Sequence, residues 1–167
     1  PHYDPEILNI GIPILGICYG AQLMAYMEGG EIQSAETGSE YGKTLLCTKD
    51  NPLFKNIPEE NICWMSHTDY VKTPPFGFSV IAHTANCPCA AFANDLRRLY
   101  GVQFHPEVTH TAYGRQILSN FLFEICGCSG DWKMENFADA SIEKYRKKLA
   151  GKKVLLALSG GVDSSVA

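Results

Sequence analysis

The sequence lacks a long apolar run and a strong excess of charge of either sign. Nowhere in its 167 residues does an apolar stretch approach the roughly 20 residues that span a bilayer. Residues 1 to 20 also lack the basic start, apolar stretch and cleavage site of a secretory signal. Fourteen Lys and Arg against eighteen Asp and Glu leave a net charge of -4, too weak to predict a nucleic-acid surface. We therefore expect a cytoplasmic protein without a membrane or nucleic-acid partner.

The cysteines lack the spacing of a disulfide framework or a zinc site. Their number, seven, is odd, and none of them stands in a C-x-x-C pair. Two C-x-C pairs, at 87–89 and 126–128, have no histidine beside them at ligand spacing. Reduced thiols, no metal site and no tightly bound cofactor are predicted.

What the chain does have is enough apolar sequence for an ordinary core, 46% of its residues. The apolar run 12–17 is typical of a buried parallel strand, and residues 19–28 have helical spacing that ends at Gly29-Gly30. Further on, β-rich runs alternate with turn residues until a one-sided helix at 112–125. The strands are expected at 43–48, 62–65, 78–84, 90–93 and 98–104.

After Cys128 the composition changes to a polar helical stretch at about 134–149, followed by a compact apolar strand at 154–158. A domain boundary is therefore predicted near residue 130. This organisation predicts an α/β chain with one domain at 1–130 and the opening of another at 131–167.

Cys18 has the surroundings of a nucleophile. Gly16 and Gly20 stand two residues to either side of it, with a strand before the motif and a helix after it, which is the nucleophile-elbow pattern with Cys in place of Ser. Glycines suit so sharp a turn, and the start of a helix is expected to lower the thiol pKa. The alternative from these residues alone is a buried core cysteine.

His105 is a candidate proton carrier for that thiol. Pro106 favours an extended backbone at His105, and in an extended segment Glu107 faces the same side as His105. A histidine oriented by a carboxylate is what a cysteine nucleophile needs to lose and regain a proton. The alternative is a surface histidine at a strand end beside a solvated glutamate.

Together, Gly-Ile-Cys-Tyr-Gly-Ala-Gln at 16–22 and Phe-His-Pro-Glu at 104–107 resemble the triad-type glutamine amidotransferases. The resemblance implies that Cys18 attacks the side-chain amide of glutamine, that His105 carries the proton and that Glu107 orients His105. It also implies glutamine-binding roles for Gln22, Ser66, His67 and Asp69. The glycine loop that stabilises the oxyanion in this family is expected before Pro1, so these residues alone are expected to make a poor amidase.

A glycine-rich loop at 159–165 follows the predicted strand at 154–158 and precedes a predicted helix. Backbone N–H groups in such a loop favour an anion, although a turn with a capping aspartate is an alternative, and the spacing of a Walker loop is absent. Leu-Ser-Gly-Gly-Val-Asp-Ser-Ser-Val at 158–166 resembles the pyrophosphate loop of the Rossmann-like ATP pyrophosphatases. The resemblance implies that ATP, as a substrate complex with Mg²⁺, is held by Ser159, Gly160, Gly161, Val162, Asp163, Ser164 and Ser165.

An amidase followed by a pyrophosphate loop is similar to the arrangement in the GMP synthetase family, in which ammonia displaces AMP from adenylated XMP. The run Phe-His-Pro-Glu-Val-Thr-His-Thr at 104–111 also resembles that family more than the amidases of anthranilate, carbamoyl-phosphate or CTP synthesis. This implies glutamine, ATP and XMP as substrates, an incomplete amidotransferase domain with a mixed, mainly parallel sheet flanked by helices, and a homodimer formed through a region beyond Ala167. Two alternatives are the amidase of another glutamine-fed synthase and a non-catalytic amidase-like module. The elbow argues against the nitrilase-type amidases, and the intact Cys18, His105 and Glu107 argue against the non-catalytic module.

Overall fold

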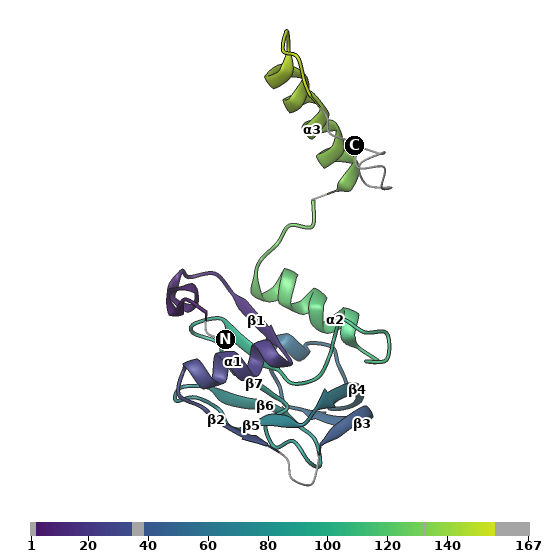
Figure 1. Ribbon diagram of the computed structural model, residues 1–167. Coiled ribbons are helices and arrows are strands. Elements are labelled where there is room, and N and C mark those ends of the chain that lie inside the picture. The colour runs from purple at the N-terminus through teal and green to yellow at the C-terminus, as the bar shows by residue number, and fades with distance from the viewer. Residues whose placement is uncertain (1–2, 35–38, 132, 156–167) are drawn as a thin grey trace. The chain divides into compact units, whose positions relative to one another are not determined.

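A computed structural model describes residues 3–34, 39–131 and 133–155 (Figure 1). The chain divides into two compact units, Pro1–Cys128 and Ser129–Ala167, which are treated separately below. The first unit contains every strand among the described residues, and the second contains one long helix.

The strands of the first unit form two sheets, and the larger has six strands in the order β1-β8-β7-β6-β3-β4. The smaller pairs β2 (Glu31–Ser34) with β5 (Asp69–Thr73). Both are short and mostly exposed, and neither was expected from the sequence. The strands of the larger sheet are β1 (Ile14–Ile17), β3 (Glu40–Thr48), β4 (Glu60–His67), β6 (Ser79–His83), β7 (Ala91–Asn94) and β8 (Leu99–Val102).

The α/β class is confirmed, but the expectation of a mainly parallel sheet is wrong for the described residues. Only β1 and β8 run parallel there, and the other paired strands are antiparallel. The reason lies in the connections: β7 and β8 are joined by residues 95–98 alone, and β6 and β7 by residues 84–90. Such short links make hairpins, whereas parallel neighbours need a crossover of about a dozen residues or more.

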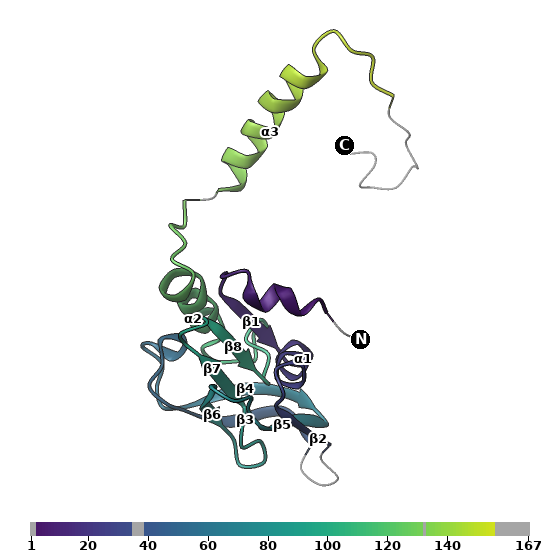
Figure 2. The same ribbon diagram turned by 90° about the vertical axis from the view of Figure 1, so that its left-hand side faces the viewer.

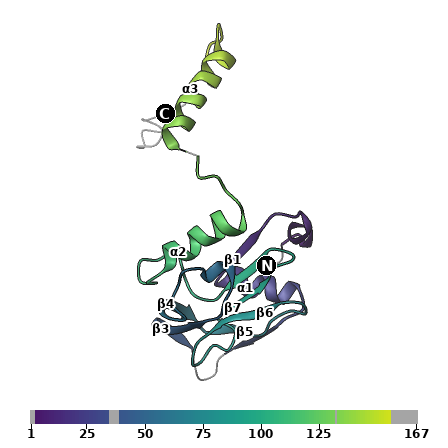
Figure 3. The same cartoon turned by 180° about the vertical axis from the view of Figure 1, so that it is seen from behind.

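Helices cover both faces of the larger sheet. Helix α1 (Tyr19–Met27) lies on one face, and α2 (Gly114–Ser119) lies on the other and continues directly into the π-helix η3 (Asn120–Ile125) (Figures 2 and 3). Short 3-10 turns, η1 (Pro5–Asn9) and η2 (Pro52–Phe54), begin at prolines after capping side chains. The predicted helix at 112–125 is therefore found, with a change of helical type at its middle.

Alternating side chains of the central strands fill two separate cores. Tyr100 and Val102 of β8 point into the core beneath α2, whereas Leu99 points into the core beneath α1. All four residues of β8 are buried, as expected of a strand covered on both faces. β8 is thereby held between the two cores, and β1, the terminal strand of the larger sheet among the described residues, runs parallel to it, so both strands end on the same side of the sheet.

In the second unit, α3 (Met134–Leu149) matches the helix expected from the sequence. Its last turn carries Arg146, Lys147 and Lys148, which favour the negative end of the helix dipole. Residues 152–155 form no regular element, and the rest of the strand predicted at 154–158 lies outside the described residues. Among the described helices, none has the length and apolar character needed to cross a membrane.

Candidate active site

Cys18 occupies the sharp turn between β1 and α1, where the two parallel strands end. Its backbone has φ 50° and ψ -110°, a positive-φ conformation that is uncommon for a residue with a side chain and that recurs at functional sites. Its N–H donates to Val102 O at 2.8 Å, which extends the β1–β8 pairing by one residue. Gly16 is required beside it, because a Cβ there would lie 2.8 Å from the backbone of Gly20 and Ala21.

The Cys18 thiol is half-buried among polar groups. Its Sγ lies 3.9 Å from Ser66 O and accepts a hydrogen bond from Gln103 Nε2 at 3.7 Å. Burial raises the pKa of the thiol, the Tyr19 backbone N–H lowers it, and the Glu107 carboxylate raises it. The start of the helix lowers the thiol pKa, as expected, but the loss of hydration outweighs this effect, so the net shift is upward. This thiol therefore needs a base to become a nucleophile.

His105 and Glu107 form the pair predicted from their spacing. Nδ1 of His105 lies 2.6 Å from Oε1 of Glu107, so the carboxylate holds the ring and leaves Nε2 as the nitrogen that can exchange a proton. The histidine side chain is 24% exposed and the glutamate side chain 47% exposed. The Glu107 charge also raises the pKa of the Cys18 thiol, and His105 follows shortly after Val102, whose carbonyl accepts from the Cys18 N–H.

The loop that carries His105 is tied to β4, the strand at the end of the larger sheet. His105 N donates to Trp64 O at 3.0 Å, and Ala112 N donates to Ile62 O at 2.9 Å. Between these bonds the Thr111 hydroxyl donates to His105 O at 2.6 Å and accepts from Trp64 N at 3.0 Å. The loop thus bonds to the free hydrogen-bonding edge of β4, and the backbone of His105 is held at its N–H by Trp64 O and at its carbonyl by the Thr111 hydroxyl.

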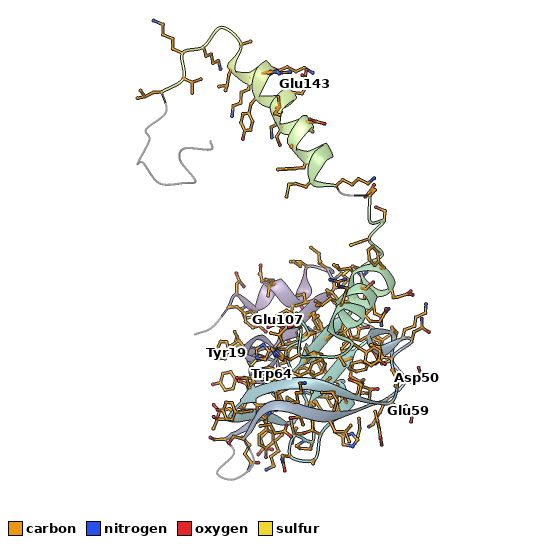
Figure 4. The ribbon with its side chains drawn as sticks, turned by 90° about the vertical axis from the view of Figure 1, so that its right-hand side faces the viewer. Tyr19, Asp50, Glu59, Trp64, Glu107 and Glu143 are labelled. Carbon is orange, nitrogen blue, oxygen red and sulfur yellow. The ribbon has the colours of Figure 1, made fainter. Side chains whose placement is uncertain are left out.

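Side chains from these segments gather at one end of the sheet (Figure 4). Tyr19, Trp64 and Glu107 lie at that end, whereas Asp50 and Glu59 mark the turn at the other end of the β3–β4 hairpin. The location agrees with the general preference of α/β sheets to form sites where parallel strands end.

Three of the predicted glutamine-binding residues, Gln22, Ser66 and Asp69, lie beside the thiol and form what we call the wall of the site. They contribute mostly backbone atoms to it. Gln22 Nε2 donates to Asp69 O at 2.6 Å and to Gln103 Oε1 at 3.0 Å. Ser66 contributes its carbonyl to the thiol, and its side chain is exposed. The structure therefore brings Gln22, Ser66 and Asp69 to Cys18.

His67 is placed differently from its neighbours. Its side chain is 4% exposed and faces the interior, where Nε2 lies 3.3 Å from Glu40 Oε2. Because alternate side chains of β4 face opposite sides, the exposed side chain of Ser66 and the buried side chain of His67 point in opposite directions. His67 lies behind the wall and not on its surface.

A model of class-I glutamine amidotransferases matches residues 1–125. The chain belongs to the class-I glutamine amidotransferase family. This confirms the sequence-based resemblance to triad-type amidotransferases.

Among curated relatives, this amidotransferase is 57% identical over 168 residues to a protein of Ruminiclostridium cellulolyticum, and 56% identical over 165 residues to one of Geobacillus kaustophilus. Both carry the name GMP synthase [glutamine-hydrolyzing], and the matches cover 100% and 98% of this chain. They cover 33% and 32% of the relatives, so the chain spans about a third of their length.

Solved structures show the same fold. A protein of Thermoplasma acidophilum, described as a GMP synthase subunit, superimposes with a TM-score of 0.68 at 35% identity, covering 83% of this chain and 64% of that one. A glutamine amidotransferase of Thermotoga maritima gives a TM-score of 0.58 at 23% identity over 84% of this chain and 53% of that one, a likeness of fold alone.

Two residues of this amidotransferase site were not found from the sequence. Gln103 is 1% exposed and links Gln22 to the thiol, and the signal was a polar residue at the end of an otherwise apolar strand. Thr111 was visible only as part of the run at 104–111, with no role assigned.

The nucleotide site predicted at the other end of the chain cannot be compared with the structure. Residues 159–165 lie outside the described residues.

Proposed function

We propose that this chain is the glutamine-hydrolysing part, with the opening of the ATP-binding part, of a GMP synthase. Such an enzyme is an ATP-dependent carbon–nitrogen ligase that aminates XMP to GMP with ammonia from glutamine. The observation that carries the proposal is that Cys18 and the pair formed by His105 and Glu107 follow the adjacent parallel strands β1 and β8, with Nδ1 of His105 2.6 Å from Oε1 of Glu107. The names of the curated relatives support the acceptor.

The chemistry follows from the positions of these groups. Nε2 of His105 takes the proton of the Cys18 thiol as Sγ forms a bond to the amide carbon of glutamine. His105 then returns that proton to the nitrogen as the carbon–nitrogen bond breaks, and ammonia leaves. A water molecule, losing a proton to His105, hydrolyses the thioester and releases glutamate with the thiol restored.

Glu107 and the start of α1 assist these steps. Glu107 keeps His105 in the tautomer that accepts at Nε2 and stabilises the imidazolium that forms. The Tyr19 N–H, which lies near Sγ and lowers the pKa of the thiol, is placed to donate to the oxyanion, because it belongs to the residue after the nucleophile. Gln22, Ser66 and Asp69 are proposed to hold the glutamine substrate, with His67 acting from behind them.

The remainder of the activity is assigned to the second unit. We assign a cytoplasmic location, a domain boundary near residue 130, and Mg²⁺–ATP binding to the loop at 159–165. ATP would adenylate XMP with release of pyrophosphate, and ammonia would then displace AMP. A homodimer is assigned to the part of the protein beyond residue 167.

The test uses the full-length parent protein with XMP, Mg²⁺–ATP and either glutamine or free ammonia. Cys18→Ala should abolish GMP formation from glutamine and leave formation from ammonia intact. GMP formation from neither nitrogen source by the unmodified protein would refute the GMP synthase assignment. Full glutamine-dependent activity in Cys18→Ala would refute the role of Cys18.

A further inference from the structure

Behind the wall beside the thiol lies a buried polar cluster that the proposed mechanism does not use. Glu40, His67 and Thr84 are 5%, 4% and 4% exposed. Burying such groups costs free energy unless they are satisfied by partners. A buried carboxylate so close to an active site therefore calls for a role.

The cluster joins three separate segments of the first unit. Glu40 of β3 and His67 of β4 are opposite partners in the ladder, and their side chains meet at 3.3 Å. The Thr84 hydroxyl, just after β6, lies 2.8 and 2.9 Å from the two oxygens of Glu40 and donates to this carboxylate. The same hydroxyl accepts from Cys87 N at 2.9 Å. Glu40 is the centre of the cluster, since it contacts both other side chains.

The end of β4 is the part of the wall that this cluster holds. His67 stands between Ser66, whose carbonyl lies 3.9 Å from the Cys18 Sγ, and the segment that brings Asp69 O to within 2.6 Å of Gln22 Nε2. Both atoms are backbone carbonyls, so no rotamer change can correct their position if the strand end shifts. Their placement depends on what anchors the backbone at His67.

A metal centre is the competing interpretation of the same cluster. Glu40, His67 and Cys87 offer ligand atoms that all lie within 4.8 Å of one another, and Nδ1 of His67 has no hydrogen-bond partner. Structural zinc sites, however, have four ligands, and only these three are grouped among the described residues.

We propose that Glu40 and His67 are positioning residues that hold the Ser66 and Asp69 carbonyls in place for glutamine binding at Cys18. The proposal rests on the glutamine hydrolysis proposed above. Glu40 acts through His67, and neither side chain touches the substrate. Loss of the anchor should therefore weaken glutamine binding and leave the second, ATP-dependent site unaffected.

The experiment compares Glu40→Leu with Glu40→Gln in the full-length protein. Glu40→Leu removes the acceptor for Thr84 and the partner of His67, and should raise the KM for glutamine about tenfold, the scale of one buried hydrogen bond left unmade. Glu40→Gln keeps an oxygen that can accept from Thr84, so its KM for glutamine should stay near that of the unmodified protein. GMP formation from ammonia should stay unchanged in both variants.

Asn120→Leu provides the matched control for loss of a buried polar side chain. Asn120 is 3% exposed and donates to Leu53 O and Lys55 O, away from the thiol. It should lower thermal stability without raising the KM for glutamine. If Glu40→Leu fails to fold, Thr84→Val removes one hydroxyl from the cluster and should raise the KM in the same direction.

The outcomes separate the two proposals. An unmodified protein that does not hydrolyse glutamine would refute the proposed function. A protein that does, with an unchanged KM in Glu40→Leu or in Thr84→Val, would refute the positioning role alone. One equivalent of zinc in the purified protein that disappears in Glu40→Leu would also overturn it, in favour of a metal centre.

Discussion

The two halves of the site are built in different ways, and the difference decides how each should respond to mutation. Cys18 is held by its immediate neighbours: a strand, a glycine-relieved turn and a helix within residues 14–27. His105 is held by Trp64, which is distant in sequence, and by Thr111 of its own loop, which bonds to both His105 O and Trp64 N. The half that contains Cys18 is a local motif, whereas the half that contains His105 depends on hydrogen bonds to the free edge of β4.

Glu107 belongs to the half that depends on the sheet edge, and its replacement gives the largest expected effect. Glu107→Gln keeps the size of the side chain but cannot stabilise a charged His105, so kcat for glutamine hydrolysis should fall roughly 10²–10⁴-fold. The measurement is glutamate release by the full-length protein with XMP and Mg²⁺–ATP present, and GMP formation from ammonia is the control. A loss of less than threefold would show that Glu107 does not orient the base.

Gly114→Ala tests how closely the loop that carries His105 is packed. A Cβ at Gly114 would lie 2.1 Å from Pro106 O, a backbone atom next to His105, so the loop must move. We expect the free energy of unfolding to fall by about 3 kcal/mol, the upper part of the usual range for overpacking, as measured by urea unfolding.

The local half supplies the comparison for this variant. Gly16→Ala places its Cβ 2.8 Å from the backbone of Gly20 and Ala21 and should cost less, about 1–2 kcal/mol. Gly20→Ala, with no atom within 4 Å of the added Cβ, should be neutral or should stabilise α1 by roughly 0.5–1 kcal/mol. Equal losses for all three variants would contradict the packing argument.

The same difference explains what the sequence could predict. The elbow around Cys18 and the His105–Glu107 pair were found because each depends on residues close together in the chain. Thr111 and Gln103 were missed as site residues, because their roles arise only when β4 and β8 are placed beside the loop. The burial of His67 follows from the register of β3 with β4, which the residue pattern alone did not specify.

The prediction that the sheet is mainly parallel was wrong for a related reason. A short apolar run such as 12–17 is compatible with a parallel strand, and β1 is one. The same reasoning does not extend to strands joined by the short turns before β7 and β8, whose lengths require hairpins.

Thr111→Val should give a smaller, specific effect on the half that holds His105. It preserves the shape of the side chain but leaves His105 O and Trp64 N without their hydroxyl partner. We expect kcat for glutamine to fall about tenfold, equivalent to about 1.4 kcal/mol, with an unchanged KM. Thr111→Ser keeps the hydroxyl and should retain most of the activity. Equal losses in the two variants would show that Thr111 contributes packing and not a hydrogen bond.

The smallest expected effect concerns the charge interaction between Glu107 and the Cys18 thiol. Burial holds the pKa of the Cys18 thiol above its ordinary value, and Glu107 adds to the rise. Only the thiolate is alkylated, so the rate at Cys18 should increase with pH through a midpoint above that of an ordinary thiol. Glu107→Gln removes one cause of the rise and should lower the midpoint, so that Cys18 reacts a few times faster at a fixed pH below it.

The alkylation test is read from the peptide that contains Cys18, since other cysteines such as Cys128 are also accessible. Burial is the larger cause of the raised pKa, so the midpoint of Glu107→Gln should still lie above the ordinary value. The variant would then combine a more reactive thiol with far slower glutamine hydrolysis. That combination would show that the charge of Glu107 serves His105 at the expense of thiolate formation, whereas an unchanged midpoint would show that Glu107 and Cys18 are not electrostatically coupled.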